Sequence, residues 1–239
     1  MAADEVLLES AVAGTASLRF YGWTQPTLSL GYFQPHRIRG SDERLAKLPF
    51  IRRPTGGGIL VHQHELTYAL GLPASLVRQG HQSWLGRMHT IIAGALASLG
   101  VSTATVAEEK QAGSLCFQHF ARGDLVLDSV ALSWEVAGKL EICRHAKVVG
   151  SAQRKQRGAL LQHGAILLAT SPHAPELPGI RELTGRSLAP GEIIPVVERE
   201  FAAYTGWILT AGDWTASERP RIEELVQIKY GQPSWNQKR

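Results

Sequence analysis

Residues 147–168, KVVGSAQRKQRGALLQHGAILL, place two apolar runs on either side of a polar loop that is rich in small and basic residues. Short apolar runs with such boundaries are typical of buried strands. The stretch therefore predicts a strand, a loop and a second strand, with a reactive group at the mouth of the loop. It contains one lysine, Lys147, and a histidine–glycine turn at His163–Gly164. A second informative block is RRPTGGGILVHQHELTYAL, residues 52–70.

The composition indicates one compact domain. The chain has 239 residues, 44% hydrophobic and 19% charged, which is near the upper limit of what one hydrophobic core can organise. No apolar run reaches the roughly 18 residues that cross a bilayer, and the opening MAADEVLLES has acids where a secretory signal has basic residues. We therefore expect a single cytoplasmic domain, residues 1–239, that does not enter a membrane.

Cysteine usage and charge narrow the function further. Cys116 and Cys143 are the only cysteines, too few for a disulfide framework or a thiolate-built metal site, so we expect reduced thiols and no metal. The formal net charge is +4, but no basic run interleaved with aromatic residues marks a nucleic-acid binder. A mildly basic surface is compatible with acidic protein partners.

Hydrophobic periodicity predicts an α+β fold, an open mixed β-sheet packed by helices. The clearest helix, 83–99, repeats apolar residues at helical spacing and ends at Gly100. Early strands followed by late helices are typical of α+β domains. Strands are expected at 17–23, 27–33, 57–61, 67–72, 125–127, 148–152 and 159–168, and further helices at 4–12, 192–204 and 218–229.

Three consecutive glycines, 56–58, follow the pair Arg52–Arg53. Glycine runs entering a strand mark close approach of the main chain to a ligand or a neighbouring strand, and two arginines suit an anion. Neither the ending of a Walker A loop nor the spacing of a dinucleotide fingerprint is present. Three histidines in polar turns also lack metal-ligand spacing, and we interpret them as structural: His62, His64 and His163.

Cys116 lies in QAGSLCFQHFARGDLVL, between a small-residue turn and an apolar segment. A free cysteine is most often a buried small hydrophobic residue, and it acts as a nucleophile only as a thiolate, which a nearby positive charge stabilises. Lys147 supplies that charge if the fold brings it alongside. Cys143, four residues before Lys147, remains an alternative thiol.

Together these blocks resemble one family. Residues 52–70, CFQHFARGDLVL and the 147–168 stretch, in this order, are similar to the superfamily of lipoate-protein ligases, octanoyltransferases and biotin-protein ligases. MAADEVLLE, RFYGWTQPTLSLGYFQP and IKYGQPSWN extend the resemblance over nearly the whole chain. It implies the biotin/lipoate ligase catalytic-domain fold, with an acyl group in a tunnel beside the glycine strand and Lys147 contacting the acyl carbonyl.

The family activates its acyl group in two ways. Ligases form an acyl-adenylate from ATP, whereas cysteine-dependent octanoyltransferases transfer the octanoyl group from acyl carrier protein onto a thiolate. The pair Cys116–Phe117 matches the cysteine motif of the second branch, and HELTYAL is also more similar to it. The resemblance therefore implies a protein N-octanoyltransferase of lipoate biosynthesis that needs no cofactor and acts on a lipoyl domain or the glycine cleavage H protein.

The resemblance also implies residue roles. Cys116 and Lys147 are the catalytic candidates. The predicted substrate-binding residues are Arg52, Gly56, Gly57, Gly58, His62, Gly150, Ser151, Ala152, His163 and Gly164.

Two alternatives remain open. One is an ATP- and magnesium-dependent lipoate-protein ligase that works through a lipoyl-adenylate, with Cys116 as a packed residue. The other is a non-catalytic acyl-binding protein. Many ligases carry an additional small C-terminal domain, and the chain ends soon after Trp235, which favours the transferase.

The span 128–145, DSVALSWEVAGKLEICRH, is longer than the connection that the family places before its lysine motif. Its strand-like beginning and end predict an enlarged hairpin near the active site, and a plain surface insertion is the alternative. How this span presents Lys147 is left open by the sequence.

Overall fold

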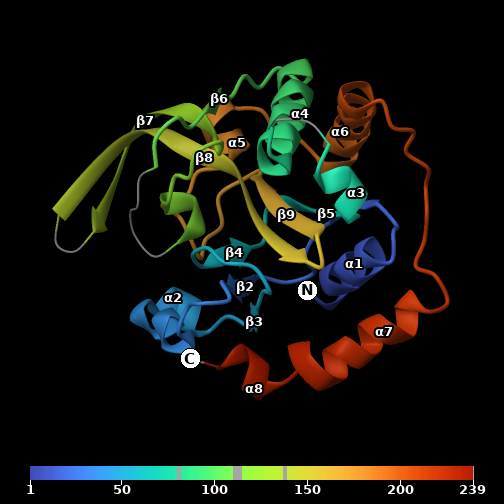
Figure 1. The fold of residues 1–239 in the computed structure, drawn as a ribbon. Coiled ribbons are helices and arrows are strands. Elements are labelled where there is room, and N and C mark those ends of the chain that lie inside the picture. Colours follow the sequence, from blue (N-terminus) through green and yellow to red (C-terminus); the bar gives the residue numbers. More distant parts are fainter. Residues whose placement is uncertain (80–81, 110–114, 137–138, 239) are drawn as a thin grey trace.

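The computed structural model describes residues 1–79, 82–109, 115–136 and 139–238, and it leaves the side chains of 41, 129–136 and 139–143 undescribed. Two β-sheets and a set of helices make up the described chain (Figure 1). The predicted α+β class is confirmed. Among the described residues, no helix combines the length and the hydropathy needed to cross a membrane.

The larger sheet has six strands in the order β1-β5-β9-β8-β7-β6, and every neighbouring pair is antiparallel. The smaller sheet has the order β3-β2-β4, with β2 parallel to β3 and antiparallel to β4. Mixed pairing is thus confined to the smaller sheet, where the helical crossover between β2 and β3 allows a parallel pair. The strands are β1 Ser17–Tyr21, β2 Thr27–Leu30, β3 Phe50–Arg52, β4 Leu60–His62, β5 Glu65–Leu72, β6 Ala104–Thr105, β7 Leu125–Val136, β8 Lys139–Gln156 and β9 Ala159–Leu167.

Helices cover both faces of the larger sheet (Figure 1). On β9, Leu160 packs into the core formed with α4 and α6, whereas Ala159 and Leu161 pack against α1. Successive strand residues point to opposite faces, so a strand covered on both sides is apolar throughout. The helical segments are α1 Ala2–Val12, η1 His36–Ser41, α2 Glu43–Ala46, α3 Ala74–Val77, α4 Trp84–Ser98, η2 Cys116–Gln118, α5 Ile180–Thr184, α6 Pro190–Thr205, α7 Glu218–Leu225, η3 Val226–Tyr230 and α8 Pro233–Asn236.

The helix boundaries follow from local chemistry. The Ser83 hydroxyl accepts from the Gly86 N–H and so caps the start of α4. Pro190 opens α6, and Gly206 closes it in the left-handed conformation, with φ of 72°. The predicted helix 218–229 is divided in the structure, since the α-helical pattern stops at Leu225 and a π-turn, η3, continues to Tyr230.

The span 128–145 belongs to a long hairpin of β7 and β8. The two strands pair from Leu125 opposite Val149 to Val136 opposite Lys139, with a register shift between Asp128 and Leu132. The predicted hairpin is confirmed, and its far end projects away from the two sheets (Figure 1). Cys143 pairs through its main chain with Leu132, but its side chain lies outside the described part of the structure.

Candidate active site

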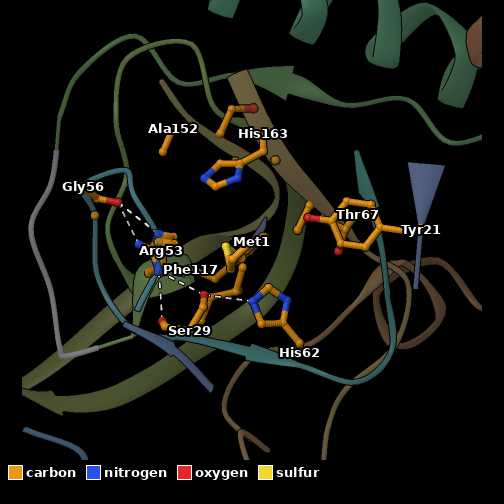
Figure 2. Close-up of a pocket in the computed structure, with 17 residues that line it drawn as sticks. Met1, Tyr21, Ser29, Arg53, Gly56, His62, Thr67, Phe117, Ala152 and His163 are labelled. Carbon is orange, nitrogen blue, oxygen red and sulfur yellow. Dashed lines mark hydrogen bonds between the residues drawn. The ribbon is translucent and has the colours of Figure 1, made fainter. Parts of the chain in front are cut away.

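A cavity of about 500 Å³, partly open to solvent, lies where the two sheets face each other. The glycine loop 56–57, β1, β2, β4, the η2 turn, residues 150–152 of β8 and residues 163–165 of β9 all contribute to its wall (Figure 2). The predicted cavity beside the glycine segment is therefore present, although the glycines form a loop and the strand begins only at Leu60.

The glycines are required by close main-chain contacts. A Cβ on Gly31, at the end of β2, would lie 2.0 Å from the Gly57 carbonyl oxygen. Gly57 has φ of +95°, and a Cβ there would lie 2.8 Å from Nη2 of Arg53 and 3.8 Å from Sγ of Cys116. The prediction of close approach is confirmed, and the neighbours are the β2 end, an arginine and the cysteine.

Cys116 stands at the start of η2 and lines the cavity, with its side chain half-buried. Its N–H donates to the Ile59 carbonyl at 2.6 Å, so the cysteine turn is tied directly to the segment that follows the glycine loop. The Gln118 side chain accepts from the Leu115 N–H at 3.0 Å and closes the turn from the other side. These bonds fix the sulfur at the cavity wall.

Lys147 enters from β8 and is almost fully buried, with 5% of its side chain exposed. Its Nζ lies 2.7 Å from Oδ2 of Asp124, and it donates to the carbonyl oxygens of His119 at 3.0 Å and Cys116 at 3.4 Å. The fold thus brings together two residues that are 31 positions apart in the sequence. The ammonium contacts the main chain of the cysteine turn and does not belong to the cavity wall.

Arg53 is the basic side chain of the cavity wall, and it was not among the predicted site residues. Its Nη1 donates to the carbonyl and hydroxyl oxygens of Ser29 at 2.9 and 3.1 Å, and its Nη2 to the carbonyls of Gly56 and Gly58 at 2.8 and 2.7 Å. Burial lowers the pKa of Arg53, and the charge of Cys116 acts in the opposite direction. Figure 2 shows the guanidinium held between the glycine loop and Ser29.

Arg52 was predicted to bind substrate, but it does not line this cavity. Its guanidinium donates to the main-chain carbonyls of Gly31, Tyr32 and Gln34 and to those of residues 235, 236 and 238 near the C-terminus. Neighbouring residues of an extended segment point to opposite sides. One arginine of the pair therefore faces the cavity, and the other faces the C-terminal segment. The position of Arg53 directly after Arg52 was the feature of the sequence that could have identified it as a site residue.

Two carboxylate–histidine pairs flank the cavity. His62 contacts Glu65 through Nδ1 at 2.6 Å and the Ser29 hydroxyl through Nε2 at 2.8 Å, and it stacks on Trp23 at 3.9 Å. Burial lowers the pKa of His62, although Glu65 opposes this shift.

The second pair lies on the opposite wall (Figure 2). His163 contacts Asp4 through Nδ1 at 3.0 Å and the Thr55 hydroxyl through Nε2 at 2.6 Å. Burial raises the pKa of Asp4, but the N-terminal ammonium, His163 and Arg19 together hold that pKa well below its usual range. Both ring nitrogens of each histidine are occupied by protein partners, as expected for structural histidines, and both rings still line the cavity.

The strands β8 and β9 supply the remaining wall. Ser151 faces Gly164 across the ladder, and a Cβ on Gly164 would lie 2.5 Å from its hydroxyl oxygen. That hydroxyl lies 2.6 Å from both Tyr68 Oη and His89 Nε2. The predicted substrate-binding residues that line the cavity are Gly56, Gly57, His62, Gly150, Ser151, Ala152, His163 and Gly164, whereas Arg52 and Gly58 do not.

Metal ligands are not gathered at the site. Within the described ranges, no group of three or more histidine, cysteine, aspartate or glutamate side chains is arranged to hold a metal ion.

Solved structures place the fold in a known class. A lipoate-protein ligase A bound with ATP is similar at a TM-score of 0.71, with 20% identity over 99% of this chain and 92% of that one. A bi-partite lipoate protein ligase from Thermoplasma acidophilum is similar at 0.66, with 18% identity over 99% and 89%. The antiparallel sheet with its helices is thus the fold of lipoate-ligase catalytic domains.

Sequence comparison identifies the family. The profile of the lipoyl protein ligase A/B catalytic domain matches residues 1–177, and the chain belongs to this family. Its relatives include the octanoyltransferase LipM of Kyrpidia tusciae, 30% identical over 99% of this chain and 93% of that protein. The octanoyltransferase LipM of Symbiobacterium thermophilum is 30% identical over 100% and 93%.

Proposed function

We propose that the protein is an octanoyltransferase of lipoate biosynthesis that carries the octanoyl group on Cys116. The observation that carries this proposal is the position of Cys116, half-buried at the wall of the cavity, next to the glycine loop and on a turn held by Lys147. The relatives named octanoyltransferase LipM, aligned over nearly the full chain, support the same activity. The donor in this proposal is octanoyl acyl carrier protein.

The reaction has two acyl exchanges. First the Cys116 thiolate attacks the carbonyl carbon of the donor thioester, the new C–S bond forms, and the carrier thiol leaves and takes up a proton. Then the deprotonated amine of a lysine on a lipoyl domain or glycine cleavage H protein attacks the same carbonyl carbon. The C–N bond forms, the amine loses its second proton, and Cys116 leaves as a thiolate.

The wall of the cavity suits an unsubstituted acyl chain. Each polar side chain that an acyl group would pass already has a protein partner, as with Tyr21 and Asp4, Ser29 and His62, and Thr67 and Trp23. A ligand group that needed its own hydrogen bond would have to break one of these buried bonds, at about 1–3 kcal/mol each. The cavity therefore favours hydrocarbon over a hydroxylated or amide-bearing chain.

The basic groups at the site are less suited to an adenylate. A mixed acyl-phosphate needs cationic donors aimed into the cavity. Arg53 is bonded to Ser29, Gly56 and Gly58, and Lys147 is paired with Asp124. Direct hydrogen bonds from these cations to a phosphate would require one of these arrangements to open.

Mass spectrometry of the intact protein after incubation with octanoyl acyl carrier protein tests the proposal. We expect one octanoyl adduct on wild type and on Cys143→Ser, and no adduct on Cys116→Ser. An adduct that persists in Cys116→Ser and disappears in Cys143→Ser would transfer the role to the other thiol. Pyrophosphate release from ATP and free lipoate without any adduct would indicate a ligase, and octanoate binding without either reaction would indicate a binding protein.

A further inference from the structure

We propose that Arg53 is the cation that faces the sulfur of Cys116, and that Lys147 is a positioning residue that holds the cysteine turn. The sequence indicated Lys147 as the source of the positive charge beside Cys116. The catalytic meaning of this division rests on the proposed thioester function, but the placement of charge next to the sulfur can be measured without any acyl substrate.

The hydrogen-bonding capacity of Lys147 is already used within the protein. An ammonium has three N–H donors, and Nζ has three partners: Asp124 at 2.7 Å, the His119 carbonyl at 3.0 Å and the Cys116 carbonyl at 3.4 Å. Asp124 is 2% exposed, so its charge offsets that of Lys147 in a region of weak screening. The pair therefore presents little net positive charge to the cavity.

The two carbonyl partners of Lys147 explain its positioning role. Both lie at the turn that begins at Cys116, and His119 itself donates its N–H to the Cys116 carbonyl at 3.2 Å. Lys147 thus binds the carbonyl at the start of this turn, which also accepts from the His119 N–H, and the carbonyl of His119, which directly follows the turn. Fixing these carbonyls sets the direction of the Cys116 side chain.

Arg53 has the opposite environment. Its guanidinium is bonded to main-chain carbonyls and to the neutral Ser29 hydroxyl, and no described ion pair of the chain includes it. Those groups orient the cation and leave its net charge in place. A guanidinium also stays protonated when it is buried, whereas an ammonium loses its proton readily.

The geometry directs this charge at the sulfur. Nη2 of Arg53 and Sγ of Cys116 both lie near the position that a Cβ of Gly57 would take, at 2.8 and 3.8 Å, so the two atoms are no further apart than the sum of these distances. Arg53 and Cys116 both line the cavity, whereas Lys147 does not.

The other charged groups of the wall each have a nearby carboxylate. Met1 also lines the cavity, and its N-terminal ammonium acts on Asp4, whose pKa it lowers. His163 is bonded to Asp4, and His62 to Glu65. Each of these carboxylates is buried with its histidine, so neither pair adds an isolated positive charge beside Cys116. Arg53 remains the basic side chain placed to attract an anion to the sulfur.

Alkylation of Cys116 by a charged and a neutral reagent tests this placement. In a Cys143→Ser background Cys116 is the one thiol, and its rates with iodoacetate and iodoacetamide are measured at low salt and fixed pH, with glutathione as the reference. We expect the ratio of the iodoacetate rate to the iodoacetamide rate to be about fivefold higher for Cys116 than for glutathione, which is the factor that ~1 kcal/mol of attraction gives. This iodoacetate preference should be lost in 1 M salt, because salt screens the charge.

Variants show which side chain provides the positive charge beside Cys116. The double variant Lys147→Met with Asp124→Asn removes the whole buried pair and should keep the preference, whereas Arg53→Met should lose it and Arg53→Lys should keep part of it. The preference depends on local charge, so it separates an electrostatic role from a loss of packing.

The proposal is overturned if wild type shows no preference, or if the double variant loses it while Arg53→Met keeps it. If Arg53→Met does not fold, the comparison of wild type with the double variant decides. Failure of octanoyl adduct formation with the iodoacetate preference intact would reject the proposed function and leave the charge assignment standing.

Discussion

Gly31→Ala should disturb the active site more than Gly56→Ala, although the backbone conformation permits alanine at both positions. The φ of Gly31 is not in the left-handed region, so alanine is permitted by the backbone. Its Cβ would nevertheless lie 2.0 Å from the Gly57 carbonyl oxygen, and at least about 1 Å of movement is needed before the contact reaches 3.0 Å. Both partners are main chain, so no side-chain rotation relieves the clash.

The expected magnitude follows from that displacement. Overpacking of this kind destabilises a protein by about 1–3 kcal/mol, and a ~1 Å misplacement of a catalytic site reduces the rate by about 100-fold. Gly57 adjoins both Arg53 and Cys116, so the shift reaches the sulfur directly. We expect a lower Tm and a kcat/KM for octanoyl transfer that is lower by roughly two orders of magnitude.

Gly56→Ala is the matched control. Its φ is also outside the left-handed region, and the nearest atom to its Cβ would be Cδ2 of Phe33 at 4.0 Å, an ordinary contact. We expect its stability to stay within about 1 kcal/mol of wild type. Equal Tm and equal kcat/KM in Gly31→Ala and Gly56→Ala would refute the reasoning that the β2 end supports the glycine loop.

Three further predictions concern the buried charges. Lys147→Met leaves Asp124 as a buried carboxylate without its cation and should lower the free energy of unfolding by about 3–5 kcal/mol. Adding Asp124→Asn should restore much of this loss. Urea unfolding that shows no such rescue would contradict the pairing. Because burial lowers the pKa of His62, the unfolded chain binds the proton more tightly, so stability should fall as pH drops from 7.5 to 5.5 through the ordinary value of about 6.5. Burial lowers the pKa of His89 as well, so His62→Gln should weaken this dependence without abolishing it, and the same substitution at the exposed His64 is the control. Arg52→Lys should release the C-terminal segment, since an ammonium cannot reach six carbonyls, and limited proteolysis should then remove residues after 230 faster than in wild type.

The long regular elements were predictable because their burial leaves a clear pattern. The helix expected at 83–99 is α4 at Trp84–Ser98, and its apolar stripe faces the core formed with β5, β8 and β9. The strand expected at 159–168 is β9 at Ala159–Leu167, whose residues are buried on both faces. The three-residue strand β3 was missed, because so short a segment shows no period.

The residues of the cavity were predictable to the extent that motifs mark them. The glycines and the histidines follow from the resemblance and from the need for close main-chain approach. The division of the arginine pair was not visible, because the turn after β3 decides which of Arg52 and Arg53 faces the cavity. Asp124 was missed as the partner of Lys147, since the two are joined only by the pairing of β7 with β8.

The partners of three buried cations could not be predicted from the sequence, for one common reason. Arg52, Arg53 and Lys147 are all buried cations whose partners are largely main-chain carbonyls of loops, short turns and the C-terminal segment. Such segments would otherwise bury unsatisfied carbonyls, so each cation stabilises one segment: the C-terminal end, the glycine loop and the cysteine turn. Every residue has a carbonyl, so these partners leave no mark in the sequence. The cations are visible there, but what they hold becomes clear only when the chain is folded.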